Sequence, residues 1–449
     1  MKPILIHNAL IINEQIKQKG SVLIESGKIS DIFTGEDIPE ATLQQSQVIH
    51  ADNKILIPGV IDDHVHFREP GLTYKADIGS ESKAAIAGGI TSYLEMPNTK
   101  PPAVTLEGLR EKFEIAEKHS FANYSFYLGA TNENIDEIKN INPREVCGVK
   151  TFMGASTGNM LVDNRSSLEQ IFAESPVLIA AHCEDESTIR NNTQFYKEKF
   201  HGEIPVEYHP LIRSEEACYK SSSLAVELAQ KYQARLHILH LSTAKELELI
   251  EKSRFNPYKK ITAEACIHHM WFDDSDYANY GTRIKWNPAI KTAHDRKALM
   301  EGIKSHAIDV VATDHAPHLM EEKDNTYLKA PSGGPMVQHS LLAMLEFYHR
   351  KKLSLNTIVE KMCHTPADIF NISKRGYIRK GYWADIVLID PFKKYRVNRE
   401  NILYKCGWSP LEGQIFSSSI SHTFVNGKIA YQNGQINEEK NARKLTFER

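Results

Sequence analysis

Histidine, lysine and aspartate side chains recur within or at the ends of apolar segments of this 449-residue chain. His64 and His66 form a His-x-His pair at the end of the apolar segment 60–66. Successive strand residues alternate between faces, so two imidazoles spaced in this way project to the same side. Further candidates follow along the chain: Lys150, His182, His240 and Asp314. Neutral imidazole nitrogens and carboxylate oxygens suit zinc and similar divalent ions, so the set predicts a metal centre.

Each of these elements is weak evidence when taken alone. A lone His-x-His is more often no metal site, because short motifs arise easily by chance. A single histidine at a strand end is more often a hydrogen-bonded structural residue. The metal interpretation therefore depends on a fold that brings all of these side chains to one face.

The middle of the chain alternates strand-like and helix-like segments. The expected strands are 60–66, 91–96, 124–129, 148–152, 177–182, 236–240, 261–265 and 309–314, and helix-like stretches are 106–119, 215–233, 244–252 and 295–306. Eight strands with helical connections are what a closed (β/α)8 TIM barrel requires, whereas an open doubly wound sheet gives no reason for eight repeats. In such a barrel the active-site groups sit at the C-terminal ends of the strands, where the candidate ligands fall.

Both ends of the chain have a different pattern, with short strands separated by turns. Segments 22–24 and 29–32 flank a turn with a glycine and predict a hairpin, and segments 384–390 and 422–430 repeat this style. We expect one small β-sandwich built from both termini. The predicted domains are residues 1–55 and 376–449 for the two parts of the sandwich, and 56–375 for the barrel.

Composition excludes several functional classes. The net charge is only −3, so nothing indicates a nucleic-acid or anionic-membrane partner. No apolar run is long enough to span a bilayer, and polar residues interrupt the N-terminus too early for a signal peptide. The six cysteines are scattered without a Cys-x-x-Cys pair, which favours reduced, buried thiols. We expect a soluble, cytoplasmic protein.

Several segments carry a resemblance to a known family. Residues 58–66, Pro-Gly-Val-Ile-Asp-Asp-His-Val-His, resemble the opening strand of the amidohydrolase superfamily, and residues 376–387 resemble its return into the terminal sandwich. Three segments resemble dihydroorotases: 66–71 (His-Phe-Arg-Glu-Pro-Gly), 96–99 (Met-Pro-Asn-Thr) and 314–318 (Asp-His-Ala-Pro-His). Allantoinases and hydantoinases share the metal ligands but usually differ at Arg68 and His318, which are therefore the discriminating positions.

The resemblance implies a binuclear metal centre, with zinc as the expected metal. Its ligands would be His64, His66, Lys150, His182, His240 and Asp314. A buried lysine has a lowered pKa, and its neutral amine can react with carbon dioxide to give a carbamate that bridges two metals. Carbamate, Asp314 and a bridging hydroxide would offset most of the charge of two dications. An unmodified Lys150 that pairs with Asp314 or solvent is the alternative.

The implied reaction is the reversible hydrolysis of (S)-dihydroorotate to N-carbamoyl-L-aspartate in de novo pyrimidine biosynthesis. A metal lowers the pKa of bound water from about 15.7 towards ~7, which provides a hydroxide nucleophile. Asp314 would carry the proton to the leaving ring nitrogen, or would act only as a ligand. The implied substrate contacts are Arg68, Asn98, Asn287 and His318, with backbone groups at Gly333 and Gly334. Arg68 suits the substrate carboxylate because its guanidinium binds such groups bidentately.

Two other functions stay open at this point. One is a sister hydrolase of neutral rings such as allantoin, hydantoins or dihydropyrimidines, although Arg68 would then lack an anion. The other is a non-catalytic scaffold that binds aspartate transcarbamoylase, although such a copy should lack ligands. That enzyme is also a candidate partner of a catalytic subunit, and we expect a homo-oligomer. Segment 154–159 lacks the Gly-Lys-Ser/Thr ending of a phosphate loop, although Ser156 or Thr157 could touch substrate, and segment 321–335 could form a wall or lid.

Overall fold

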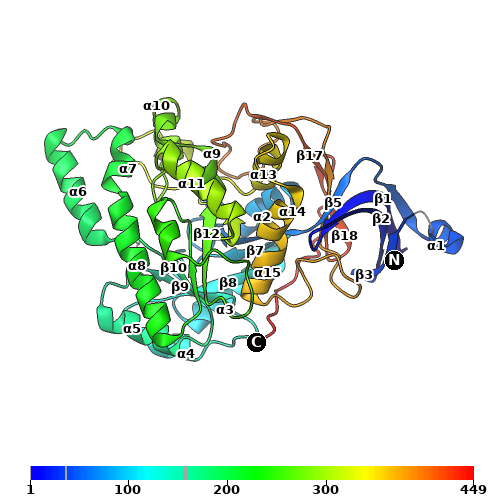
Figure 1. The fold of residues 1–449 in the computed structure, drawn as a ribbon, viewed down its shortest axis with the longest axis horizontal. Helices are drawn as coiled ribbons and strands as arrows, with labels where there is room; N and C mark the ends of the chain where they lie inside the picture. Colours follow the sequence, from blue (N-terminus) through cyan, green and yellow to red (C-terminus); the bar gives the residue numbers. More distant parts are fainter. Residues whose placement is uncertain (1, 36–37, 155–159) are drawn as a thin grey trace.

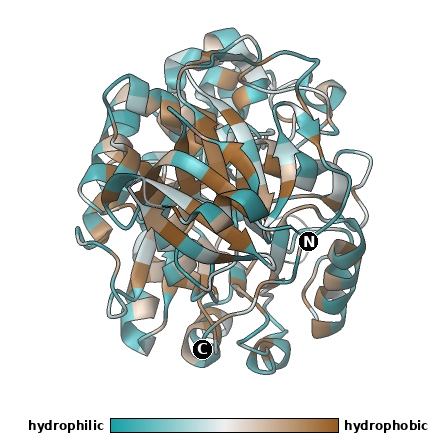
Figure 2. Cartoon of the chain, turned by 90° about the vertical axis from the view of Figure 1, so that its right-hand side faces the viewer, coloured by the Kyte–Doolittle hydropathy of each residue, from teal (hydrophilic) through white to brown (hydrophobic). Residues whose placement is uncertain are grey.

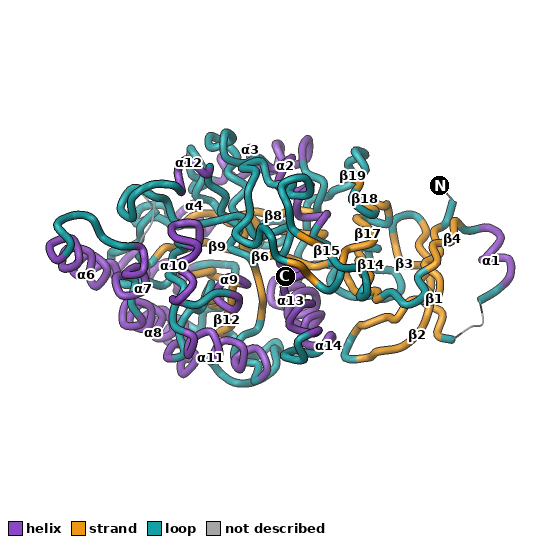
Figure 3. Tube along the Cα trace, turned by 90° about the horizontal axis from the view of Figure 1, so that it is seen from above, coloured by secondary structure: helices purple, strands orange, loops and turns teal. Residues whose placement is uncertain are grey.

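The computed structural model describes residues 2–35, 38–154 and 160–449, and its centre is a barrel of eight parallel strands (Figures 1 and 3). The strands, in spatial and chain order, are β6 (Val60–Val65), β7 (Ile90–Glu95), β8 (Asn123–Gly129), β9 (Gly148–Phe152), β10 (Ile179–His182), β11 (Leu236–Ile238), β12 (Ile261–Cys266) and β13 (Val310–Ala312). A parallel bridge between Val65 and His315 closes the ring, and His66 N donates to His315 O over 2.7 Å. The expected (β/α)8 barrel is confirmed.

Helices connect and surround the strands. They are α2 (Ile78–Ala87), α3 (Leu106–His119), α4 (Ile135–Lys139), α5 (Arg165–Glu174), α6 (Glu186–Lys199), α7 (His209–Ile212), α8 (Glu215–Tyr232), α9 (Ile267–Trp271), α10 (Tyr277–Tyr280), α11 (Ala293–Lys304), α12 (Met320–Lys323), α13 (Ser340–His349), α14 (Leu355–Val359) and α15 (Thr365–Phe370). Figure 2 shows hydrophobic residues concentrated in the strands and hydrophilic residues on the outer helices and loops. This distribution follows from burial of the barrel wall between helices and interior.

One segment that was expected to form a helix has a different structure. Segment 244–252 contains a short 3₁₀ helix, Lys245–Leu249, in place of a full α-helix. The physical reason is that Glu246 turns inward, where it accepts hydrogen bonds from Ser222 Oγ (2.7 Å) and Thr243 Oγ1 (2.8 Å). Buried side-chain partners of this kind override the helix propensity of the segment.

Both ends of the chain form one nine-stranded sheet beside the barrel (Figure 1). Its strands are β1 (Ile4–Asn13), β2 (Ile16–Glu25), β3 (Lys28–Thr34), β4 (Gln47–His50), β5 (Ile55–Pro58), β14 (Ile386–Asp390), β17 (Ser419–Val425), β18 (Lys428–Gln432) and β19 (Gln435–Ile436); α1 (Glu40–Gln45) lies between β3 and β4, and β15 (Tyr395–Arg396) pairs separately with β16 (Ile415–Phe416). The halves join where β5 runs antiparallel to β14, with Leu56 opposite Leu388. The β2–β3 hairpin and the domain shared by both termini are as expected.

Side chains along β5 and β14 alternate between two hydrophobic cores, and this alternation joins the sheet to the barrel. Leu56 and Leu388 pack into the sheet's own core, whereas Ile57 and Val387 point to the other face and pack with the barrel. This period of two is what a strand buried on both faces requires. The exact domain boundaries stay a prediction.

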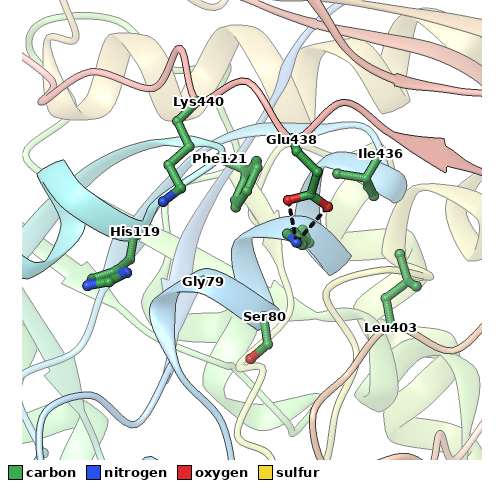
Figure 4. Close-up of a pocket in the computed structure, with 9 residues that line it drawn as sticks. Gly79, Ser80, His119, Phe121, Leu403, Ile436, Glu438 and Lys440 are labelled. Atoms are coloured by element: carbon green, nitrogen blue, oxygen red, sulfur yellow. Dashed lines mark hydrogen bonds and ion pairs between the residues drawn. The ribbon is translucent and has the colours of Figure 1, made fainter.

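The C-terminal segment returns to the barrel after β19. In the groove of Figure 4, Lys83 Nζ contacts both carboxylate oxygens of Glu438 at 2.8 Å and lies 4.8 Å from the centre of the Phe121 ring. Further on, Leu445 and Phe447 are buried in a core at the N-terminal ends of the strands. The tail thus covers the barrel end opposite to the predicted site. In the described residues, no helix has the length and apolarity needed to cross a membrane.

Candidate active site

A pocket of about 530 Å³, lined by several ionisable side chains, opens at the C-terminal ends of the barrel strands. The predicted residues that line it are His64, His66, Arg68, Asn98, Lys150, His182, His240, Asn287, Asp314, His318 and Gly333. The barrel therefore brings every predicted metal ligand together with most of the predicted substrate contacts. Gly334 is not among the lining residues, because its carbonyl accepts a hydrogen bond from Ala316 N behind the pocket wall (3.0 Å).

Three predicted ligands converge on one point. Asp314 Oδ1 lies 3.3 Å from His64 Nε2 and 3.0 Å from His66 Nε2. The other ring nitrogens are engaged elsewhere, since His64 Nδ1 is 3.0 Å from Glu264 Oε1 and His66 Nδ1 is 2.7 Å from Asn98 Oδ1. An acceptor on each Nδ1 can hold a ring proton there and free Nε2 for a metal, which is the arrangement of metal-binding histidines. In this structure His66 Nε2 is instead within hydrogen-bond distance of Asp314 Oδ1.

A second pair of histidines lies beside the first. His182 Nδ1 is 2.9 Å from His240 Nε2, and His182 Nε2 is 3.0 Å from Glu184 Oε2. The Glu184 carboxylate fixes the proton of His182 on Nε2, so its Nδ1 lone pair faces the other ring. Burial lowers the pKa of both histidines, and the neighbouring Lys150 lowers it further. The His64 and His240 rings are 5.2 Å apart, so the two groups of donors adjoin.

Lys150 projects from β9 into the same pocket. Its side chain is buried, and burial lowers the pKa of its amine to about 8. Within the described part of the chain its Nζ has no ion-pair partner and lies 4.6 Å from the centre of the Phe152 ring. The charge of Asp314 still raises this pKa, and the choice between a carbamate and an unmodified lysine stays a prediction. Ser156 and Thr157 lie outside the described residues.

Taken together, these side chains fit a pair of divalent ions. Neutral imidazole nitrogens, one carboxylate and a buried amine face a common space, and His182 Nδ1 lies 2.9 Å from His240 Nε2. Imidazole nitrogens and carboxylate oxygens are donors that suit divalent ions such as zinc, and His64, His66 and Asp314 are close enough together to hold one.

The backbone is unusual at three of these positions. His240 and Asp314 have φ of 42° and 44°, and Arg68 has φ of 68°. Left-handed conformations are uncommon for non-glycine residues and cluster at functional sites. The left-handed backbone at His240 and Asp314 also explains why β11 and β13 end at Ile238 and Ala312. Each strand ends two residues earlier than the sequence pattern predicted.

Arg68 and His318 form one wall of the pocket. The Arg68 side chain is 7% exposed, its Nε donates to Pro317 O (3.1 Å) and its Nη2 lies 3.1 Å from His318 Nε2. Among the described residues no carboxylate pairs with this guanidinium. A buried cation without a counter-ion is costly, so the pocket is arranged to receive an anion.

Two buried lysines hold segment 321–335 as the adjoining wall. Lys323 Nζ donates to Pro331 O (2.9 Å) and Gly333 O (2.8 Å). Lys285 Nζ donates to Tyr327 O and Ala330 O, each over 2.6 Å. Both amines donate to main-chain carbonyls and so fix the loop. Burial lowers the pKa of Lys285 to about 8 and lowers the pKa of Lys323 well below its usual range.

Asn287 and Gly333 complete the lining. Asn287 Oδ1 is buried and has no hydrogen-bond partner among the described residues, so a ligand N–H could satisfy this acceptor. Gly333 has φ of 120°, and a Cβ there would come within 2.7 Å of Ala316 O. Only glycine therefore lets the backbone pass at this point.

Comparison with known proteins assigns this site to a family. The Amidohydrolase family profile matches residues 55–430. The chain belongs to the amidohydrolase family. A protein named dihydroorotase from Methanosarcina acetivorans is 32% identical over 97% of this chain and 94% of its own length. Another protein named dihydroorotase, from Carboxydothermus hydrogenoformans, is 32% identical over 95% of this chain and 96% of its own.

Solved structures of other amidohydrolases share the fold. The L-hydantoinase (dihydropyrimidinase) of Arthrobacter aurescens superposes with a TM-score of 0.92 at 25% identity, covering 99% of this chain and 100% of that one. The dihydropyrimidinase of Brevibacillus agri superposes with a TM-score of 0.88 at 22% identity over the whole of both chains, which shows the fold alone.

Sequence reasoning missed the residues that orient the ligands of this amidohydrolase. Glu264, on β12, accepts from His64 Nδ1 and from His240 N (3.0 Å each). Glu184 holds His182 and forms an ion pair with Arg213. The only available signal was a glutamate in an otherwise apolar strand or directly after one, which is rarely buried without a partner.

Three other histidines near the ends of barrel strands contact groups outside the pocket. His315 Nε2 is 2.8 Å from Glu81 Oε2, and His268 stacks on Trp286 with 4.3 Å between ring centres. His237 Nε2 lies 3.1 Å from Asp63 Oδ2, beneath the site. None of the three lines the pocket.

Proposed function

We propose that this amidohydrolase is a dihydroorotase, which catalyses the reversible hydrolysis of (S)-dihydroorotate to N-carbamoyl-L-aspartate in de novo pyrimidine biosynthesis. The observation that carries the proposal is the buried, unpaired Arg68 beside His318, next to the six convergent ligand residues. Relatives named dihydroorotase, about as long as this chain and 32% identical to it, support the proposal.

The charge of the pocket favours an anionic ring. Arg68 is a buried cation without a carboxylate partner among the described residues. Lys75 has one such partner, Glu322, at 2.8 Å. A substrate carboxylate offsets this positive charge, whereas a neutral ring leaves the guanidinium of Arg68 desolvated and unpaired. The same potential attracts N-carbamoyl-L-aspartate, which carries two carboxylates, in the reverse direction.

We propose two divalent metal ions, most simply Zn²⁺, held by His64, His66, His182, His240, Asp314 and a carbamylated Lys150. When bound, such ions supply an activated water at neutral pH and polarise the ring carbonyl. The carbamate is supported by the buried, unpaired amine, whose pKa of about 8 leaves a reactive neutral fraction at physiological pH.

The protein's own residues divide the remaining work. Burial opposes charge on Asp314, yet the adjacent His64 and His66 hold its pKa well below its usual range, so Asp314 is an anion that can accept a proton. It then delivers that proton to the ring nitrogen that leaves. Asn287 offers its free Oδ1 to a ring N–H, and Arg68 fixes the carboxylate.

Asn98 contacts His66, one of the proposed metal ligands. Its Oδ1 accepts from His66 Nδ1 over 2.7 Å, which leaves its amide N–H groups for the substrate. His318 contributes a second donor beside Arg68. The backbone of Gly333 and Gly334 is proposed to complete the ring contacts.

A hydantoinase is the second candidate, favoured by the TM-score of 0.92 with the L-hydantoinase of Arthrobacter aurescens. Arg68 argues against it, because hydantoin and dihydrouracil offer no carboxylate. A silent scaffold is disfavoured because all six ligand side chains line the pocket. A cytoplasmic homo-oligomer, with aspartate transcarbamoylase as a further partner, completes the proposal.

Parallel turnover assays of the zinc-loaded protein test the proposal against dihydroorotate, allantoin, hydantoin and dihydrouracil. Fast, chelator-sensitive turnover of dihydroorotate alone is expected. Arg68→Ala should lose most of this turnover and keep its metal, and Arg399→Ala, an 85% exposed arginine, serves as the control. Preference for a neutral ring, or equal loss of metal and turnover in Arg68→Ala, would overturn the carboxylate assignment; inactivity on all four rings would favour a scaffold.

A further inference from the structure

Lys75 lies in the pocket wall against the far side of His318. Its side chain is 9% exposed, and its Nζ is 2.9 Å from His318 Nδ1 and 2.8 Å from Glu322 Oε1. An ammonium group has three donors and no acceptor. The Nδ1 atom of His318 must therefore accept a hydrogen bond from Lys75 and carry no proton.

The other ring nitrogen meets the opposite partner. His318 Nε2 lies 3.0 Å from Ser332 O, and a carbonyl oxygen can only accept, so Nε2 carries the proton. These two contacts favour the same neutral tautomer, whereas the contact of Arg68 Nη2 with Nε2 (3.1 Å), taken alone, favours the other one. Burial lowers the pKa of His318 to about 3, with Arg68 and Lys75 adding to the effect, so the ring is neutral at physiological pH.

This tautomer decides what His318 presents to a ligand. Its Nε2–H lies 3.1 Å from Arg68 Nη2, so two donors stand side by side at the pocket surface. A carboxylate oxygen is the partner that satisfies both donors. In the other tautomer Nε2 would accept from Arg68, and its lone pair would repel the same oxygen.

Glu322 is the group that could stabilise the unfavourable tautomer. Its Oε2 lies 3.6 Å from His318 Nδ1, beyond a normal hydrogen bond but close enough to take up a proton on Nδ1 after a small movement. Lys75 contacts both His318 and Glu322, and its ion pair with Glu322 is made through Oε1. Tyr74 OH also donates to Oε1 over 3.3 Å and helps to hold the carboxylate in place.

We propose that Lys75, oriented by Glu322, is a positioning residue that fixes the Nε2–H tautomer of His318 and thereby sets the carboxylate-binding face of the pocket. The kinetic consequence rests on the proposed function. The tautomer itself does not, because it is inferred from the contacts of His318 with Lys75 and Ser332, which involve no substrate.

Nitrogen-15 NMR of the zinc-loaded protein with labelled histidine reads the tautomer directly, with the His318 signals assigned by their loss in His318→Asn. The wild-type protein should have an unprotonated Nδ1 and a protonated Nε2 at His318. In Lys75→Met the two signals should exchange or average. A proton on Nδ1 in the wild type, or an unchanged tautomer in Lys75→Met, would overturn the proposal whatever ring the enzyme hydrolyses.

Kinetics then test the consequence. Lys75→Met should raise the KM for dihydroorotate roughly tenfold, about the effect of losing one hydrogen bond to a charged group, with a much smaller change in kcat. Lys75→Arg should restore part of the loss, because a guanidinium also donates to Nδ1. The matched control is Lys83→Met, which removes the lysine of the distant Lys83–Glu438 pair and should leave KM unchanged.

A double-mutant cycle separates positioning from general structural damage. In a His318→Asn background, Lys75→Met should add little, since Lys75 acts through the imidazole. The same fold-loss in both backgrounds would refute the proposal. If the wild type hydrolyses only neutral rings, the proposed function fails, and the NMR result alone decides the role of Lys75.

Discussion

Glu184→Gln is the most informative perturbation of the metal centre. The Glu184 side chain is fully buried, and its Oε2 accepts from His182 Nε2 over 3.0 Å and pairs with Arg213. The substitution keeps the size of the side chain and removes its charge. His182 then loses the carboxylate that fixes its Nδ1 lone pair towards His240, while the guanidinium of Arg213 loses its counter-ion.

The surroundings of Glu184 set the size of its contribution to the stability of the folded state. Burial opposes charge on Glu184, but Arg213 and His182 outweigh it and bring the pKa from the usual 4.5 to about 2. At 1.36 kcal/mol per pKa unit, the folded state gains about 3 kcal/mol from this carboxylate at neutral pH. Because the folded pKa is the lower one, the gain is present above about pH 4.5 and is lost as the pH falls towards about 2. Metal affinity should fall about 10- to 100-fold, as for other groups that hold a ligating histidine.

Two assays measure these effects. Competition with a chelator gives the zinc affinity, and urea denaturation of the metal-free protein at pH 7 and pH 4 gives the stability. The variant should be less stable at pH 7, and the gap should narrow at pH 4. The control is Glu169→Gln, a partly exposed glutamate that pairs with Arg165 and Lys231. Unchanged zinc affinity, or a stability gap that widens on acidification, would refute this reasoning.

Three further outcomes are expected. Asp314→Asn should lower kcat for dihydroorotate about 10²- to 10⁴-fold, the usual contribution of a general acid–base group, and near-normal kcat would exclude a role in proton transfer. Lys150→Ala should lose metal, measured by elemental analysis, and a short carboxylate such as propionate should restore part of the activity; a fully loaded, active variant would show that no carbamate is needed. Asn287→Ala should raise KM roughly tenfold with metal content unchanged, and an unaltered KM would remove Asn287 from substrate binding.

The sequence was enough to predict the barrel and the side chains that line its mouth. Strand periodicity located all eight strands, and chemistry at their ends located His64, His182 and Asp314. The reason is physical: a parallel barrel places every strand end on the same face, so residue type and strand position together fix the location.

The groups that orient the ligands could not be predicted in this way. Glu264 reaches His64 across 200 positions of sequence, and Lys75 reaches His318 across 243. Such contacts depend on the three-dimensional approach of separate loops and strands, for which local patterns carry no signal. The left-handed backbone of His240 was equally hidden, because a histidine at a strand end looks like a continuation of the strand.

The sheet formed by both termini also has a consequence for synthesis of the chain. β5 pairs on one side with β14, where Leu56 meets Leu388, so the partner strand is translated only after the whole barrel. Until then β5 is an open, apolar edge on a nascent chain, and exposed edges of this kind recruit other strands. Pairings so distant in sequence are also slow to form. Chaperone supply during expression, more than the stability of the finished barrel, is therefore expected to limit the yield of soluble protein.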